Sequence, residues 1–172
     1  MNRFSGQDLG TSLRLRLQGA RRIAIVGVGD ELLPFDQLGM VAAKKIDQLH
    51  LGNVKVFCAG TVPESVTGPV RRFRPDHTLF LDAADMGAQP GTIAVIDQQD
   101  IQADLFSTHV LPLPVVMEFL AQESGTGVTL LGIQPDRLEP DKGLSGSDEE
   151  LFNRNLEILS SVLGDRQMQQ EK

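Results

Sequence analysis

The chain has 172 residues, of which 41% are hydrophobic and 23% charged, and its formal net charge is −7 at pH 7. This composition is typical of a globular protein, and no apolar run approaches the ~20 residues that cross a bilayer. The acidic balance and the lack of Trp and Tyr argue against nucleic acid as a partner, because its binders usually present a basic face. We therefore expect one domain over residues 1–172 with no membrane span.

The chain begins with an extension and ends with a polar tail. Residues 1–21 form an N-terminal extension without the apolar block of a secretory signal, so we expect a cytoplasmic protein. The spacing of Leu9, Leu13 and Leu17 favours a helix in part of this extension, although a strand with alternating leucines also fits. Residues 165–172 read as a polar tail. The acidic surface permits a monomer, which is the state we expect.

Apolar runs typical of buried strands alternate along the chain with helical patterns. The expected strands cover residues 22–29, 53–60, 77–84, 91–97 and 127–133. Helices are expected over 38–49, over 112–125, where proline lies in the first turn, and after a capping box formed by Ser147 and Glu150. This order predicts an α/β fold, a three-layer sandwich with a twisted, mostly parallel central sheet flanked by helices.

The stretch GVGDELLPFDQLG, residues 27–39, begins like a phosphate-binding loop. A dinucleotide fingerprint needs a third glycine for close packing of the helix on the strand, and Leu32 stands at that position. Asp30 and Glu31 would also place negative charge where a phosphate would lie. The loop therefore argues against a nucleotide site.

Two aspartates and one histidine are candidate ligands of a metal ion. Asp36 precedes a predicted helix, where an N-cap is the simplest interpretation. Asp82 ends an apolar strand, where it could equally be a turn residue, and His109 precedes the helix that starts near Pro112. Carboxylate oxygens and a neutral imidazole from separate loops would suit an open metal site, but their spacing alone does not establish one.

The single cysteine, Cys58, lies in the apolar run VKVFCAG. It has no cysteine partner within the chain, and a lone cysteine in such a run is most often a small buried hydrophobic residue. We expect Cys58 to be buried and to have no catalytic role.

Five blocks of the sequence resemble, in the same order, those of the hydrogenase maturation endopeptidases. They are IAIVGVGDELLPFDQLG, AGTVPES, RPDHTLFLDAADMGAQPGTIAVID, STHVLPLPVVMEFL and LLGIQPDRLEPDKGLS. Each block is weakly specific, but together they extend from residue 23 to residue 145. The family fold, a twisted sheet between helices, agrees with the fold predicted above.

The resemblance implies an enzyme that removes the carboxyl-terminal peptide from the large-subunit precursor of a nickel-iron hydrogenase. It also implies that Asp36, Asp82 and His109 are the catalytic and metal-binding residues, and that the nickel is supplied by the precursor. The sequence departs from the family at two positions. Asp30 stands where asparagine is usual, and Phe35 stands where many members have an acidic residue. These changes bear on substrate preference, because Asp36 keeps the carboxylate.

Two other functions remain open at this point. A non-catalytic chaperone could hold the hydrogenase large subunit in the same cleft, and a nucleotide-binding regulator would use the loop at residues 27–39. The segment GIQPDRLEP, with Gln134, Asp136 and Arg137, fits either a solvated turn or a substrate contact.

Overall fold

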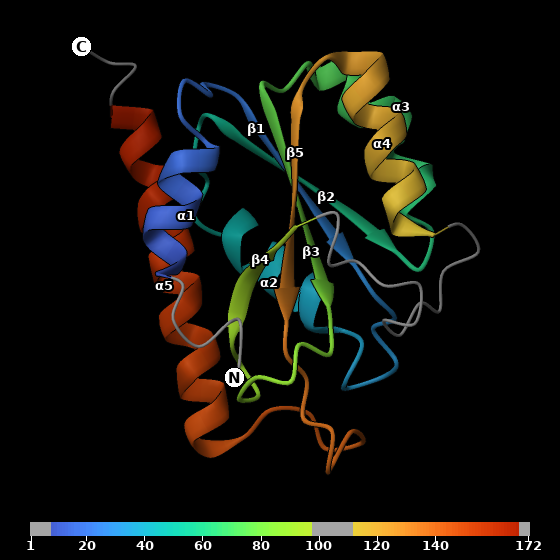
Figure 1. The fold of residues 1–172 in the computed structure, drawn as a ribbon, viewed down its shortest axis with the longest axis vertical. Coiled ribbons are helices and arrows are strands. Elements are labelled where there is room, and N and C mark those ends of the chain that lie inside the picture. Colours follow the sequence, from blue (N-terminus) through green and yellow to red (C-terminus); the bar gives the residue numbers. More distant parts are fainter. Residues whose placement is uncertain (1–7, 98–111, 169–172) are drawn as a thin grey trace.

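The computed structural model describes residues 8–97 and 112–168, and Figure 1 shows their arrangement. The strands are β1 (Ile23–Val28), β2 (Val54–Gly60), β3 (His77–Ala83), β4 (Ile93–Ile96) and β5 (Gly127–Ile133). The helices are α1 (Leu9–Arg16), α2 (Leu38–Asp47), α3 (Thr67–Phe73), α4 (Leu113–Ser124) and α5 (Gly146–Met168), with a short 3-10 helix, η1 (Pro63–Val66). None of the helices in these ranges combines the length and apolarity needed to cross a bilayer.

The strands form one five-stranded sheet in the order β2-β1-β3-β5-β4. The first four strands of this order run parallel, and only β4, at one edge, is antiparallel to its neighbour β5. Parallel strands need crossover connections, and the intervening helices supply them. The predicted α/β fold with a mostly parallel sheet is confirmed.

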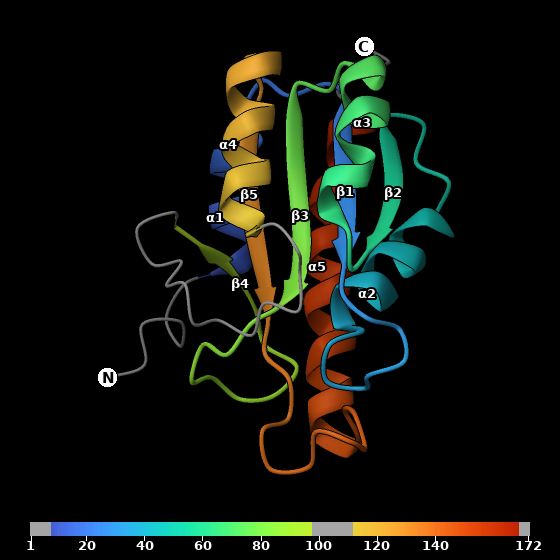
Figure 2. The same cartoon turned by 90° about the vertical axis from the view of Figure 1, so that its right-hand side faces the viewer.

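Helices cover both faces of the sheet because alternate strand residues point to opposite sides. Ile23 and Ile25 of β1 face a core cluster to which α1, α2 and α5 contribute. Ala24 and Val26 face a second cluster to which α3 and α4 contribute. Figures 1 and 2 show α1 and α5 on one side of the strands and α3 and α4 on the other. The predicted three layers are therefore present.

Two local predictions need correction. Cys58 is exposed rather than buried. The cause is its position near the end of β2, which is an edge strand of the sheet. Cys58 also interacts electrostatically with Lys44 and Glu31. At the carboxyl-terminal helix, α5 begins at Gly146, so Ser147 lies inside the first turn instead of preceding it. The predicted helix within residues 1–21 is confirmed by α1, whose first turn is capped by the Asp8 carboxylate accepting from the Gly10 amide.

Candidate functional site

The loop between β1 and α2 is folded tightly against its own beginning. Gly29 has a φ of 132°, and a side chain there would place its Cβ 2.0 Å from the Asp36 carbonyl oxygen. Only glycine fits such a close backbone approach. The Asp36 amide in turn donates to the Leu33 carbonyl, with 2.9 Å between the two atoms. The loop therefore returns Asp36 to the carboxyl end of β1.

The carboxylate of Asp36 is almost completely buried, with 1% of the residue exposed. Its Oδ2 accepts a hydrogen bond from the Asp30 amide at 2.8 Å. Helix α2 has Gln37 as its N-cap residue and no side-chain cap. The N-cap interpretation of Asp36 is therefore wrong, because its carboxylate points back to the start of the loop and not to the helix amides.

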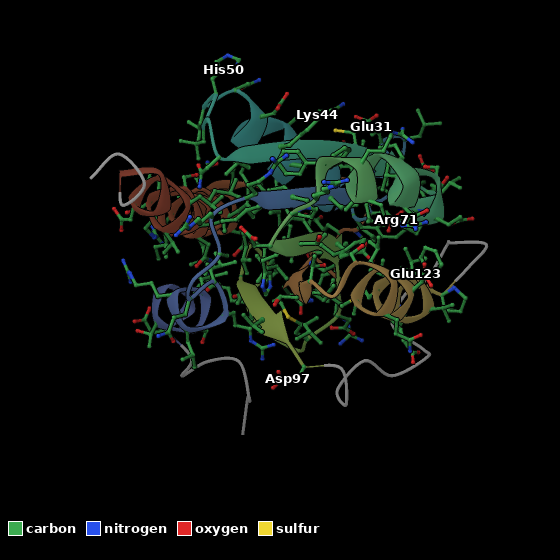
Figure 3. All side chains as sticks on the ribbon, turned by 90° about the horizontal axis from the view of Figure 1, so that it is seen from above. Glu31, Lys44, His50, Arg71, Asp97 and Glu123 are labelled. Carbon is green, nitrogen blue, oxygen red and sulfur yellow. The ribbon has the colours of Figure 1, made fainter. Side chains whose placement is uncertain are left out.

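The same loop is unsuited to a phosphate group. Two of its backbone amides are already satisfied within the loop, since Asp30 donates to Asp36 and Leu32 donates to the Asp30 carboxylate at 2.9 Å. On its outer side, Lys44 of α2 donates to Glu31, and Figure 3 shows these two side chains on the same side of the molecule. A phosphate-binding loop instead directs free amides at its ligand.

The start of α2 lies directly on the carboxyl ends of two strands. A Cβ at Gly39 would be 2.1 Å from the Leu81 carbonyl oxygen and 2.4 Å from the Val28 carbonyl oxygen. Leu81 immediately precedes Asp82, a half-buried residue of β3 that is paired with Gly132 of β5. The close packing at Gly39 thus brings the loop that carries Asp36 to the strand end that carries Asp82.

The third predicted ligand, His109, lies outside the described residues, which end at residue 97 and resume at 112. The described ranges contain no group of three or more His, Cys, Asp or Glu side chains that could hold a metal ion. The two carboxylates offer the hard oxygen donors that a divalent ion accepts, and an imidazole would have to complete the set. The three-residue metal site stays a prediction.

Gln134 joins two loops beyond the carboxyl ends of β3 and β5. Its Oε1 accepts from the amides of Met86 and Ala88 at 2.6 and 3.2 Å, and the residue is 1% exposed. Its Nε2 donates to Asp85 Oδ1 at 3.3 Å and to the Pro135 carbonyl at 3.1 Å. Gln134 is therefore a buried structural residue, and the solvated-turn interpretation is wrong for it.

Arg137 and Asp136 differ from Gln134 because they lie at the surface of the same segment. Arg137 is exposed and pairs with Asp85, with 3.0 Å between Nη1 and Oδ2. Asp136 accepts from the amides of Leu138 and Glu139 at 2.8 and 3.2 Å, which is a turn-stabilising pattern. The link from Asp85 to Gln134 and Arg137 was missed from the sequence, since residues about fifty positions apart carry no spacing signal.

A cavity of about 320 Å³ opens beside Asp36, between the loop after β1 and the loop after β5. Its lining residues are Phe35, Asp36, Ala83, Pro135, Asp136, Arg137 and Pro140. Figure 2 shows the loops after β1, β3 and β5 at one end of the sheet. Open α/β sheets place their ligand crevice beyond the carboxyl ends of the strands, so this cavity is at the expected place.

The fold is that of an open α/β protein. At the carboxyl ends of its parallel strands, a buried aspartate, Asp36, lines a cavity. The family model of the hydrogenase maturation proteases (HycI) matches residues 40–160, a range that begins just beyond Asp36 and includes Asp82 and His109. The chain therefore belongs to the hydrogenase maturation protease family.

Individual relatives agree with this assignment. The Hydrogenase 3 maturation protease of Escherichia coli K12 is 39% identical over 111 residues, covering 63% of this chain and 70% of that protein. The crystal structure of the nickel-iron hydrogenase maturation protease HycI from Thermococcus kodakarensis has a TM-score of 0.76 and 28% identity, covering 88% of this chain and 98% of that one. The solution structure of the endopeptidase HycI from Escherichia coli has a TM-score of 0.66 and 30% identity, with 84% and 90% covered.

Proposed function

We propose that this chain is an endopeptidase that removes the carboxyl-terminal peptide from the nickel-loaded large-subunit precursor of a nickel-iron hydrogenase. The observation that carries the proposal is the buried carboxylate of Asp36, held by the Asp30 amide at the edge of the sheet where β3 ends at Asp82 and Ala83. The names of the relatives supply the reaction class, because they are maturation proteases.

In this proposal the nickel belongs to the substrate and is recognised by Asp36, Asp82 and His109. Ionised carboxylates and a neutral imidazole are needed to bind a metal ion, so recognition weakens as the pH falls. The precursor's metal then polarises the bond to be cut or its attacking water, and one of the aspartates orients that water as a base. Cleavage is thereby limited to precursors that already contain nickel.

The direct test is incubation of the protein with nickel-loaded and nickel-free precursor, followed by mass spectrometry of the large subunit. We expect only the nickel-loaded precursor to lose its terminal peptide. Asp36→Asn, Asp82→Asn and His109→Ala should each slow the loss at least a hundredfold, whereas Glu157→Gln, an exposed change on α5, should not. Equal processing of both precursors would exclude nickel-dependent recognition.

A non-catalytic chaperone is the alternative that the same experiment separates. It would form a complex with the precursor while the precursor kept its full mass. A nucleotide-binding regulator is less well supported, because the amides of Asp30 and Leu32 are occupied within the loop. Calorimetric titration with dinucleotides should accordingly show no binding.

A further inference from the structure

The cavity beside Asp36 has a mainly apolar wall. Phe35, Ala83, Pro135 and Pro140 contribute carbon surface, and the cavity has a volume of about 320 Å³. This volume is at the lower end of the range for ligand pockets, so it suits one large side chain better than a whole peptide. Asp36 also lines this cavity, which places an apolar subsite next to the proposed catalytic residue.

The charged residues at the cavity already have roles in the fold. Arg137 pairs with Asp85, and Asp136 accepts two amides of its own turn. Asp36 accepts the Asp30 amide and is 1% exposed. Because these charged groups already have partners, an incoming charged side chain of either sign would lose its hydration against the carbon surface.

Both walls of the cavity are fixed in position. On one side, Phe35 lies between Leu33 and Asp36, whose backbones are joined by the hydrogen bond from the Asp36 amide to the Leu33 carbonyl. On the other side, Gln134 holds the start of the Pro135 segment against the loop after β3. A preformed wall loses little conformational entropy on binding, which favours selectivity for shape.

We propose that this cavity receives an apolar side chain of the substrate residue next to the bond that is cut, and that Phe35 determines this preference. The inference rests on the proposed peptidase function, because it takes Asp36 as the group beside the reacting bond. Phe35 supplies an aromatic surface at a position where an acidic residue would present a charge. Replacing that ring should therefore change which substrate is preferred rather than whether any substrate is cut.

The test uses nickel-loaded precursors in which each of the two residues flanking the cut bond is changed in turn to Ala, Leu, Phe, Lys or Asp. The value of kcat/KM is measured from the released peptide for the wild-type protein, Phe35→Ala and Phe35→Asp. We expect one of the two flanking positions to favour Leu or Phe over Ala by about tenfold or more, the scale of discrimination that apolar pockets achieve. Phe35→Ala should reduce this ratio to near one, and Phe35→Asp should favour Lys over Leu.

Leu32→Ala is the matched control, because Leu32 is in the same loop, is 87% exposed and does not line the cavity. It should leave the whole preference profile unchanged. Thermal unfolding of every variant identifies any loss of activity that comes from misfolding. A flat wild-type profile, or the same apolar preference in Phe35→Asp, would overturn the assignment of the cavity while leaving the peptidase function intact. A wild-type protein that cut no precursor would instead contradict the proposed function.

A second measurement tests which side chain the cavity binds, without requiring cleavage of a precursor. Short peptides that span the cut bond are added to the isotope-labelled protein, and the NMR shifts of the Phe35 and Ala83 amides are followed. Peptides with Leu at the preferred position should shift both amides at concentrations where peptides with Lys do not. Equal shifts for the two peptides would overturn the assignment even if the precursors are processed.

Discussion

The carboxylate of Asp36 accepts a hydrogen bond from the amide of Asp30, with 2.8 Å between Oδ2 and N. This contact closes the loop after β1 and holds a buried carboxylate near the carboxyl ends of the strands. Under the proposed function Asp36 has two separable roles, because the hydrogen bond needs an acceptor atom whereas metal recognition would need a charge. The two roles can be distinguished by substitution.

Asp36→Asn keeps an oxygen acceptor for the Asp30 amide but removes the charge, so we expect the free energy of unfolding to change by less than about 1 kcal/mol. Processing of the nickel-loaded precursor should nevertheless fall at least a hundredfold. Asp36→Ala should additionally destabilise the fold by about 1–3 kcal/mol, because it leaves the amide without its acceptor. Urea denaturation and the mass-based processing assay measure the two effects. An Asp36→Asn protein that processed at the wild-type rate would show that the charge is not required.

The close approach of α2 to the sheet makes Gly39 sensitive to the smallest substitution. The Cβ of Gly39→Ala would lie 2.1 and 2.4 Å from two backbone carbonyl oxygens, those of Leu81 and Val28, which cannot rotate away. We expect a loss of about 3 kcal/mol or more in the free energy of unfolding, at the upper end of overpacking effects. Gly164→Ala is the control, because a Cβ on this helical glycine would meet no atom within 4 Å and alanine is the better helix former.

The control should therefore be neutral or stabilising by up to about 1 kcal/mol. Chemical denaturation of both variants checks the comparison. If Gly39→Ala were as stable as the wild type, the placement of α2 on the ends of β1 and β3 would be wrong.

Gln134 should be essential for the order of the loop after β3. Gln134→Leu leaves the amides of Met86 and Ala88 without their acceptor and removes the bond to Asp85, so we expect a loss of about 2–4 kcal/mol. Hydrogen exchange at the Met86 and Ala88 amides should accelerate, since both lose protection. The control Gln122→Leu alters an exposed glutamine of α4 and should leave the exchange of these two amides unchanged. Unchanged exchange in Gln134→Leu would contradict the structural role.

The strands and the layers could be predicted from the sequence because burial on both faces leaves continuous apolar runs such as residues 23–28. The directions in which individual polar side chains point could not be predicted from the sequence. Asp36 precedes a helix, which indicates a cap, yet its carboxylate turns toward Asp30 because the tight backbone at Gly29 brings the two together. Likewise the apolar neighbours of Cys58 indicate burial, but the position of β2 at the edge of the sheet exposes it.

The candidate site, too, could be predicted from the sequence only in part. The apolar run before Asp82 predicts that this residue lies at the end of a strand, and the structure confirms it, because β3 ends at Ala83. The partnership of Gln134 with Asp85 depends on the pairing of β3 with β5, which brings the two following loops together. Sequence patterns describe neighbours along the chain, whereas this contact is set by which strands lie side by side.

His77, at the start of β3, should make the stability of the fold depend on pH. Burial, followed by the positive charge of Arg16, lowers the pKa of His77 to about 4, whereas an unfolded chain would have a value near 6.5. The unfolded state therefore binds the extra proton between these two values. The protonation of His77 therefore does not affect the free energy of unfolding above pH ~6.5. As the pH falls from 6.5 toward 4, proton uptake by the unfolded state lowers the free energy of unfolding. From these values we expect His77 to account for about 2 kcal/mol of the stability lost between pH 7.5 and pH 5.

The contribution of His77 is isolated by comparing variants, because carboxylates also titrate as the solution becomes acidic. His77→Gln cannot take up the proton and keeps a polar side chain near Thr129 Oγ1, which lies 2.9 Å from His77 Nε2 in the native protein. The free energy of unfolding of this variant should fall less between pH 7.5 and pH 5 than that of the wild type. His50→Gln changes an exposed histidine and should keep the full wild-type slope. Equal slopes for all three proteins, measured by urea denaturation at each pH, would show that His77 titrates alike in the folded and unfolded states.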